Sequence, residues 1–328
     1  MIKRFAIAYI IIAAFFFANY SFAYDPLEIN NVNVRTLELS AFDAQRQREI
    51  PILVYMGDDW SKTSKPVILF SHGLGGSRYN SAYLGKHWAS RGYIAVFLQH
   101  IGSDESVWKG KGLLRKIFSL KKAASGENFK LRVFDVPAVL DQLSIWNSQR
   151  SHPLYGMLDM NGVGMSGHSF GAITTQAVSG QKFPSLGVNF TDRRIKAAAI
   201  FSPSKPKYGG SIDGMFGSVS TPWLLMTGTH DDSPIGKITP ESRLAVYPAL
   251  PSGDKYEIVL NNANHFVFTE RSLRKKEKAR NPNHHRVILA LSTAFWDSYL
   301  KGNFEAYRWL NGSGPLNVME SADRWQKK

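Results

Sequence analysis

The chain contains no cysteine in its 328 residues. Disulfide bridges, a catalytic thiol and a lipid anchor on an N-terminal cysteine are therefore excluded. Any fold that the chain adopts must be held together by its core. The hydrophobic share of 44%, with 12% aromatic residues, is sufficient for one large core. We therefore expect residues 24–328 to form a single domain.

Long hydrophobic runs are also scarce, and the one at the N-terminus is not followed by a second. This run, Phe5–Phe17, is too short to span a membrane comfortably. Lys3 and Arg4 precede it, and Ser21-Phe22-Ala23 forms a small-x-small cleavage site. The pattern predicts a signal peptide over residues 1–23, cleaved after Ala23. The mature chain would then be periplasmic or secreted.

Acidic residues are fewer than basic ones, 26 against 40, which gives a net charge of +14. The positive charge is concentrated in Lys109–Lys122 and Arg271–Arg286. Two interpretations stay open. These stretches either attract anionic substrates, polymers or a membrane surface, or they are solvated loops of a basic exported protein, which we favour. No nucleic-acid-binding motif, metal-chelating spacing or internal repeat is present, so we expect no nucleic acid and no metal as partners.

Strand and helix patterns alternate along most of the chain. Strands are predicted at Val32–Ser40, Pro51–Met56, Val67–Phe70, Tyr93–Leu98, Ile195–Phe201, Trp223–Met226 and Tyr256–Leu260. Helices are predicted at Asn80–Arg91, after a cap at Asp135 with Pro137 in the first turn, and at Val287–Leu300. This alternation predicts an α/β fold with a mostly parallel sheet.

One long segment, Ile101–Lys130, interrupts this alternation. It is polar and basic, with Trp108, Leu113, Leu114, Ile117 and Phe118 scattered through it. Loops of this length in a compact domain are usually functional or disordered. We expect a lid-like insertion around residues 101–130, whose apolar residues form one wall of an acyl pocket. The glycine-rich stretch Tyr208–Val219 is expected to form the other wall.

The motif with the clearest chemical meaning is Gly-x-Ser-x-Gly at Gly167–Gly171. It follows a short apolar run and precedes a small, partly apolar segment, which is the pattern of a strand that turns sharply into a helix. Such a turn exposes the hydroxyl of Ser169, and the flanking glycines leave room for the neighbouring backbones. Ser169 is therefore the candidate nucleophile.

A serine nucleophile needs a histidine to accept its proton and a carboxylate to orient that histidine. In this type of sheet both follow the serine in the chain, the acid first, on loops after later strands. His265 follows Tyr256–Leu260 and is the candidate base. The acid is Asp231 or Asp232, after Trp223–Met226; the spacing from Gly228 favours Asp231.

Acyl transfer also needs hydrogen-bond donors for the oxyanion of its tetrahedral intermediate. We expect one from the backbone N–H of Phe170, directly after the nucleophile, and the other from Leu74 N–H in the glycine-rich stretch His72–Gly76. The remaining histidines have other roles: His72, His100 and His168 are predicted to line the pocket or to be structural, and the adjacent His284 and His285 to be loop residues.

The stretch Phe70–Gly76, the Gly167–Gly171 motif and the late Asp and His together resemble the dienelactone hydrolase-like and platelet-activating-factor acetylhydrolase-like branch of the α/β-hydrolases. The resemblance spans about Val32–Leu300. It implies an α/β-hydrolase fold and ester hydrolysis through an acyl-enzyme, without a metal or organic cofactor. Nothing in the sequence implies an obligate protein partner.

The sequence departs from that branch at two points. The plasma acetylhydrolases carry their acid after the strand that follows the nucleophile, whereas here that segment, Phe201–Ser204, contains no acid. This departure moves the chain toward the bacterial predicted hydrolases. Dienelactone hydrolases proper use a cysteine nucleophile, which this chain lacks.

These observations predict an exported serine ester hydrolase that acts on small or medium acyl esters, including lipid esters. The same three residues would also serve an acyltransferase or a hydrolase of amides or polyesters. A non-catalytic envelope-binding protein is the alternative from another class, although such a protein would not need to keep all three residues.

Overall fold

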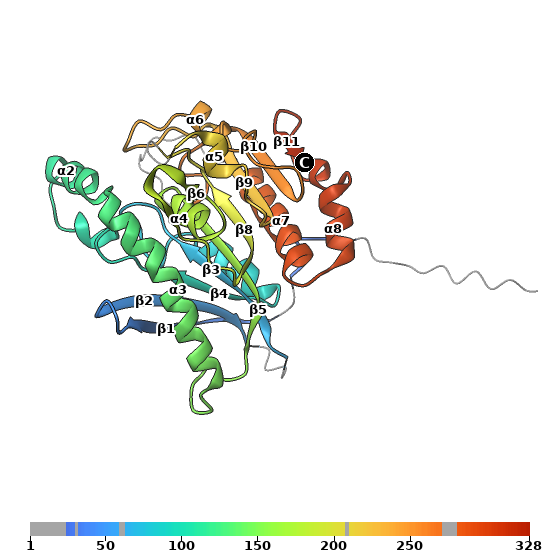
Figure 1. Ribbon diagram of the computed structural model, residues 1–328. Helices are drawn as coiled ribbons and strands as arrows, with labels where there is room; N and C mark the ends of the chain where they lie inside the picture. Colours follow the sequence, from blue (N-terminus) through green and yellow to red (C-terminus); the bar gives the residue numbers. More distant parts are fainter. Residues whose placement is uncertain (1–23, 30–31, 59–62, 207–209, 271–280) are drawn as a thin grey trace, which may run out of the picture.

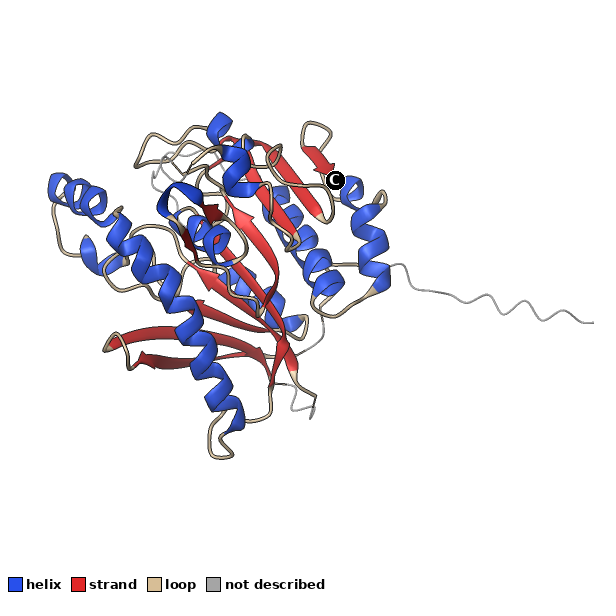
Figure 2. Cartoon of the chain, viewed as in Figure 1, coloured by secondary structure: helices blue, strands red, loops and turns tan. Residues whose placement is uncertain are grey.

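The computed structural model describes residues 24–29, 32–58, 63–206, 210–270 and 281–328. The predicted signal peptide, residues 1–23, lies outside the described residues. A nine-stranded sheet runs through the described part in the order β1-β2-β4-β3-β5-β8-β9-β10-β11 (Figures 1 and 2). Its strands are β1 Val34–Asp43, β2 Arg48–Gly57, β3 Lys65–Ser71, β4 Ile94–Leu98, β5 Leu158–His168, β8 Ile195–Phe201, β9 Trp223–His230, β10 Lys255–Asn264 and β11 Arg324–Lys327.

The six central strands from β4 to β10 pair in parallel, and antiparallel pairs occur only toward the two edges of this sheet, among β1, β2 and β4 and between β10 and β11. The central strands are almost continuously buried because helices cover both faces. The predicted mostly parallel α/β fold is confirmed, and the arrangement is that of an α/β-hydrolase.

Two layers of helices enclose the sheet (Figure 1). Helices α1 (Ala82–Ser90) and α7 (Pro282–Tyr299) pack on one face, and α8 (Phe304–Asn311) packs against α7. Helices α3 (Gly126–Ser148) and α4 (Phe170–Val178) pack on the other, together with the short α5 (Ile212–Phe216). The short helix α6 (Pro240–Leu244) lies beside β9. None of the described helices is long and apolar enough to cross a bilayer.

Smaller elements fill the connections between these layers. The strands β6 (Lys182–Phe183) and β7 (Val188–Asn189) form a small separate hairpin, and η2 (Pro184–Leu186) lies between them. The insertion after β4 contains η1 (Glu105–Val107) and helix α2 (Leu113–Ala123), and η3 (Gly314–Asn317) follows α8. The predicted lid-like insertion is thus helical, and in Figure 1 its helix α2 stands out beyond the edge of the sheet.

Two local predictions, the helix cap at Asp135 and the loop position of His284 and His285, were wrong. In both cases the side chains contact residues that are distant in the sequence. Asp135 does not cap a helix: α3 begins at Gly126, where the Ser125 side chain accepts from Asn128 N–H, and Asp135 lies buried within it. Pro137 is consequently inside α3. His284 and His285 lie in the first turn of α7, after an Asn281 cap, and their Nε2 atoms contact the carbonyl oxygens of Asn261 and Val267.

A buried carboxylate joins the N-terminal segment to α1, β4 and α7. Asp297 of α7 is almost fully buried, accepts hydrogen bonds from Tyr93 and Tyr24, and forms ion pairs with Arg91 and Lys301. Burial opposes its ionisation, but Lys301, Tyr93 and Arg91 together lower the pKa of Asp297 below its usual range. Among the described residues, Asp297 is the carboxylate that pairs with both cations.

We predict that Asp297→Asn lowers the free energy of unfolding by about 3 kcal/mol, because it leaves two cations without their buried counter-charge. Denaturant titration at neutral pH measures this change. Asp141→Asn is the matched control, because Asp141 pairs with Arg194 at the surface, where its side chain is 67% exposed. That substitution should cost less than about 1 kcal/mol. Equal losses in the two variants would contradict the assignment.

Candidate active site

The three residues proposed from the sequence lie together at the carboxyl edge of the sheet. Ser169 directly follows β5, Asp231 directly follows β9, and His265 directly follows β10. These strands run in parallel, so their carboxyl ends meet at one edge, where open α/β sheets bind ligands. The fold thus brings together three residues that lie far apart in the sequence.

Ser169 lies on a sharp turn between β5 and α4. Its backbone has φ 59° and ψ −114°, a conformation that L-residues rarely adopt. The turn also requires a very close approach, since a Cβ on Gly171 would lie 1.9 Å from the carbonyl oxygen of Ser71 in β3. Glycine is therefore required at this position for α4 to start so close to β3, and the serine hydroxyl is left facing the cavity.

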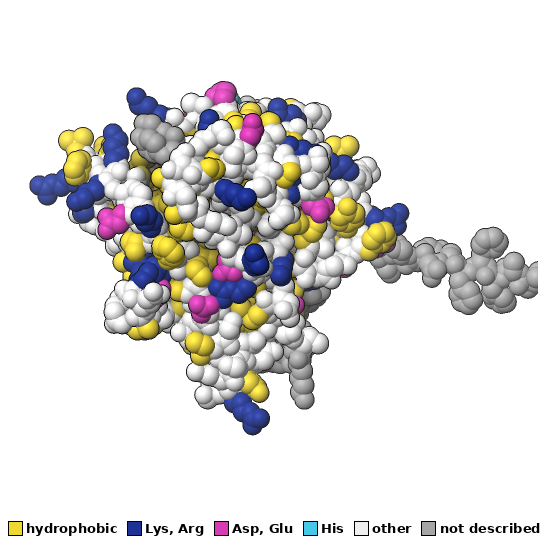
Figure 3. Space-filling view, in the orientation of Figure 1, with side chains coloured by type: hydrophobic (Ala, Val, Ile, Leu, Met, Phe, Trp, Pro, Cys, Tyr) yellow, Lys and Arg dark blue, Asp and Glu magenta, His cyan; other side chains and the backbone are white. Residues whose placement is uncertain are grey.

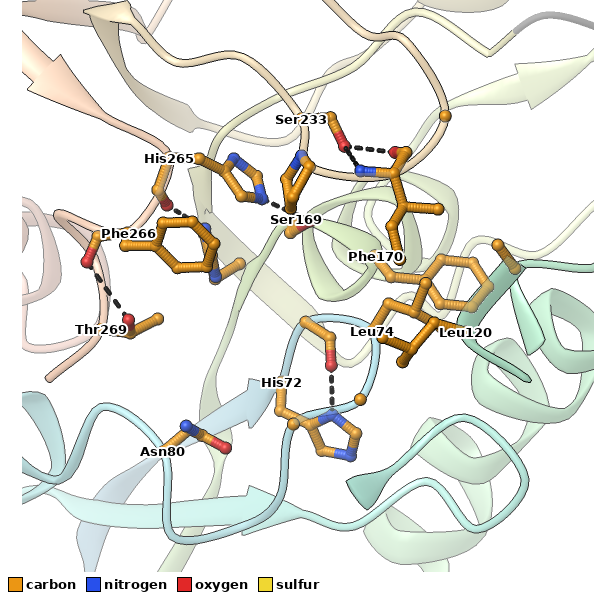
Figure 4. A pocket seen from close by; sticks show the side chains of 18 of the residues that line it. His72, Leu74, Asn80, Leu120, Ser169, Phe170, Ser233, His265, Phe266 and Thr269 are labelled. Atoms are coloured by element: carbon orange, nitrogen blue, oxygen red, sulfur yellow. Dashed lines mark hydrogen bonds between the residues drawn. The ribbon is translucent and has the colours of Figure 1, made fainter. Parts of the chain in front are cut away.

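A series of hydrogen bonds connects the three side chains. Ser169 Oγ lies 2.9 Å from His265 Nε2, and His265 Nδ1 lies 2.6 Å from Asp231 Oδ1. Figure 4 shows His265 turned toward Ser169. Asp231 is fully buried and also accepts a hydrogen bond from Thr227 Oγ1, whereas Asp232 is exposed. With Nδ1–H donated to the carboxylate, Nε2 is free to accept the serine proton.

A buried arginine holds Asp231 and His265 in place. No sequence pattern predicted it. Arg243 of α6 is 1% exposed, and its Nε lies 3.0 Å from Asp231 Oδ1 and 2.7 Å from the carbonyl oxygen of the same residue. Its Nη2 lies 3.1 Å from His265 Nδ1. The guanidinium therefore balances the charge of Asp231 and fixes the carboxylate against the imidazole.

The loop after β8 is the place where the plasma acetylhydrolases carry their acid. In this chain the loop binds Arg243 instead. Its oxygens in Ser202, Pro203 and Ser204 all accept hydrogen bonds from Arg243 Nη1. The loop thus holds the arginine that in turn holds Asp231. Asp231, the candidate acid, and the loop that holds Arg243 thus follow neighbouring strands of the sheet, β9 and β8.

His168, directly before Ser169, contacts the candidate base His265 from the side of the protein interior. Its Nε2 donates to the carbonyl oxygen of His265 at 2.9 Å, and its ring packs against Phe268. Burial, together with the nearby His265 and Arg243, lowers the pKa of His168 well below its usual value. His168 is therefore a neutral donor that fixes the backbone of His265.

The glycine-rich loop after β3 lies beside Ser169, the candidate nucleophile. Leu74 and Phe170 both line the cavity next to Ser169, and within the described chain neither of their backbone N–H groups donates to another protein group (Figure 4). Both donors are thus available to an oxygen bound beside Ser169. The insertion holds this loop from outside, through Trp108 Nε1–H to Gly75 O and through Gly75 N–H to Ser103 O.

A second Ser–His–Asp series, entirely buried, lies under the glycine-rich loop. Ser71 Oγ is 2.8 Å from His100 Nε2, and His100 Nδ1 is 2.9 Å from Asp135 Oδ2. All three residues are inaccessible to solvent, so this serine cannot meet a substrate. Arg46 and Arg48 balance the charge of Asp135. The series is structural, and it ties β3, β4 and α3 together below the loop.

Arg132 of α3 extends this buried network to the loop. It is fully buried and donates to Ser103 Oγ, Ser71 Oγ and the His72 carbonyl oxygen, the last at 2.7 Å. Burial lowers the pKa of Arg132 to about 9, which leaves the guanidinium charged at neutral pH. The guanidinium also lies 4.4 Å from the ring of Phe170, so one cation contacts both sides of the site.

A cavity of about 650 Å³ opens over Ser169. The insertion lines it in part as predicted, through Trp108, Leu113 and Ile117 together with Leu120. Leu114 and Phe118 were expected in this wall as well, but they point away from the cavity and are exposed. The second predicted wall was wrong. Within the described part of Tyr208–Val219, Met215, Phe216 and Val219 are buried in a core cluster and do not line the cavity. Residues Ser233–Gly236 and Ile238, in the connection from β9 to α6, line the cavity instead.

One comparison with known proteins supports the resemblance. Residues 54–117 match the family described as platelet-activating factor acetylhydrolase, isoform II. The match covers about a fifth of the chain and includes β3, the glycine-rich loop and β4. The resemblance to the acetylhydrolase-like branch of the α/β-hydrolases is confirmed, and this family implies a hydrolase of esters. The chain has no match among curated proteins.

His100, which is buried under the glycine-rich loop, makes the stability of the fold depend on pH. Burial, helped by Arg132, lowers the pKa of His100 to about 4 despite its contact with Asp135. An unfolded histidine titrates near 6.5. Between pH 6.5 and pH 4, His100 is therefore protonated in the unfolded chain but neutral in the folded one. Acidification through this range favours unfolding, so stability that is present above pH 6.5 is lost as the pH falls toward 4.

We predict that His100 accounts for about 2 kcal/mol of the stability lost between pH 7 and pH 5. Denaturant unfolding of the parent and of His100→Gln at both pH values measures this, and the variant should lose less on acidification. His230→Gln is the control, because His230 is exposed. A pH dependence in His100→Gln that equals that of the parent would contradict a buried neutral His100.

Proposed function

We propose that this protein is an exported serine ester hydrolase that cleaves small or medium acyl esters through an acyl-enzyme on Ser169. The family supplies the ester-hydrolase class. The observation that carries the proposal is the continuous series from Ser169 through His265 to Asp231 at the edge of the sheet. Export rests on the N-terminal pattern of Lys3, Arg4 and Phe5–Phe17.

The geometry supports a two-step mechanism. Ser169 Oγ attacks the acyl carbon while His265 Nε2 takes its proton, and the oxyanion that forms is bound by the N–H groups of Leu74 and Phe170. His265 then gives the proton to the leaving alkoxide, and the acyl group stays on Ser169. Water, activated by the same imidazole, releases the acid and restores the serine.

Asp231 and its neighbours would keep His265 productive during both steps. The imidazole becomes an imidazolium twice in each cycle, and the carboxylate 2.6 Å away stabilises that charge and fixes the tautomer. Thr227 and Arg243 hold the carboxylate in place. His168 fixes the backbone of the base, so the imidazole does not need to be ordered by the substrate.

The cavity supports an acyl ester of small to medium size. Its volume of about 650 Å³ lies in the range of small-molecule sites, and much of its lining is apolar, from Leu74, Ile117, Leu120, Phe170, Ile173 and Phe266. Acyl transfer to an alcohol, or hydrolysis of an amide or polyester, would use the same residues. A binding protein without activity would need neither the accessible serine nor its two partners.

The test is hydrolysis of p-nitrophenyl esters of increasing acyl length by the mature protein, with Ser169→Ala alongside. We expect activity with short and medium chains that falls as the chain outgrows the cavity. Ser169→Ala should lower kcat by at least about 10⁴-fold. The three residues act together, so the loss of one disables the other two. Wild-type turnover in Ser169→Ala would refute the proposal.

The choice of acid is tested by two adjacent substitutions. Asp231→Asn should lower kcat by about 10⁴-fold, because an amide holds His265 in the wrong tautomer. Asp232→Asn is the matched control and should change kcat less than about threefold, since that side chain is exposed. Circular dichroism checks that both variants are folded. A larger loss in Asp232→Asn than in Asp231→Asn would contradict the assignment.

A further inference from the structure

Helix α2 presents apolar side chains in two directions. Leu113, Ile117 and Leu120, spaced as one face of a helix, line the cavity, and Leu113 is at the same time 73% exposed. Leu114 and Phe118, also four residues apart, do not line it and are 82% and 71% exposed. A solvent-facing helix surface is normally polar, so two large apolar side chains at neighbouring exposed positions call for an explanation.

The charged side chains of α2 itself are all basic. Arg115, Lys121 and Lys122 of α2 are exposed, and no acidic residue occurs between Gly110 and Ser125. Figure 3 shows basic and hydrophobic side chains side by side at the place where α2 stands out in Figure 1. Exposed leucine and phenylalanine flanked by cations are characteristic of helices that lie in the interface of an anionic membrane.

The helix is fixed to the rest of the insertion from its inner side. Lys116 Nζ lies 3.8 Å from the centre of the Trp108 ring, and Lys111 Nζ donates to Val107 O and Ser119 Oγ. Trp108 in turn donates to Gly75 O of the glycine-rich loop. A surface that contacted Leu114 and Phe118 would therefore lie beside the cavity mouth and would be held in a fixed relation to Ser169.

We propose that α2 docks this protein on anionic lipid membranes. Leu114 and Phe118 enter the acyl-chain boundary, while Arg115, Lys121 and Lys122 contact the anionic headgroups. The docking brings the cavity mouth to the lipid surface. That it supplies membrane-borne esters to Ser169 rests on the proposed function, whereas the docking itself does not depend on any reaction.

The experiment is cosedimentation of the mature Ser169→Ala protein with lipid vesicles, so that no lipid is consumed. We expect binding to vesicles of phosphatidylcholine with phosphatidylglycerol and little binding to phosphatidylcholine alone. Leu114→Ser/Phe118→Ser should weaken the partition by at least about tenfold, because two large apolar groups no longer enter the membrane. Lys121→Glu/Lys122→Glu should weaken it by at least about tenfold as well.

Matched controls separate docking by α2 from general effects of hydrophobicity and charge. Leu186→Ser/Leu316→Ser removes two exposed leucines from other elements, and Lys182→Glu/Lys196→Glu reverses two exposed lysines elsewhere. Both controls should keep more than half of the binding. Introduced into the chain with Ser169 intact, the α2 substitutions should leave hydrolysis of a soluble short-chain ester unchanged, because these four side chains do not line the cavity.

Two outcomes would overturn the proposal. One is failure of the parent to bind anionic vesicles. The other is binding that depends on charge alone, with Leu114→Ser/Phe118→Ser as strong as the parent, because the membrane contact would then be diffuse. Neither outcome depends on ester hydrolysis, and failure of the proposed function would appear instead as absent turnover in a protein that still docks.

Discussion

The site depends on one close backbone contact, between the start of α4 and the end of β3. The space that a Cβ on Gly171 would take is occupied by the carbonyl oxygen of Ser71, 1.9 Å away. This contact forces Ser169 into its unusual backbone conformation and brings it next to the glycine-rich loop that continues β3. Ser169 and the loop are thus positioned by the backbone of the sheet, before any side chain contributes.

Buried cations then stabilise the parts that the sheet brings together. Arg132 holds the glycine-rich loop through the carbonyl oxygen of His72, and Arg243 holds Asp231 through its carboxylate and its backbone. Each guanidinium has five donors in a planar fork, which suits it to bind several fixed oxygens at once. Both are at most 1% exposed, so water competes little for these contacts and the site is rigid before substrate arrives.

Much of the fold and the candidate residues of the site could be predicted, because both leave strong local patterns. Apolar runs followed by Gly-x-Ser-x-Gly, by an aspartate and by a histidine mark strand ends, and parallel strands bring their ends together. Sequence spacing alone could not decide between Asp231 and Asp232. The structure gives a physical criterion, since one side chain is buried against His265 and the other is exposed.

The remaining features depend on contacts between distant segments. Asp135 has the residue type of a helix cap, but its role comes from His100 and two arginines that approach from β2 and the turn before it. Arg243 is one of 40 basic residues, and nothing near it in sequence marks it as buried. The second cavity wall was misplaced for a similar reason, because glycines in Tyr208–Val219 indicated a loop but not the core cluster beneath it.

The central claim is that Ser169 is a nucleophile that forms a covalent acyl intermediate. The most direct measurement is peptide mass spectrometry after the folded mature protein reacts with a fluorophosphonate, which captures an activated serine. The account predicts a single adduct, on the peptide that contains Ser169, with loss of ester hydrolysis in proportion to labelling. Full labelling of a different serine, or unlabelled Ser169 in a protein that hydrolyses esters, would contradict it.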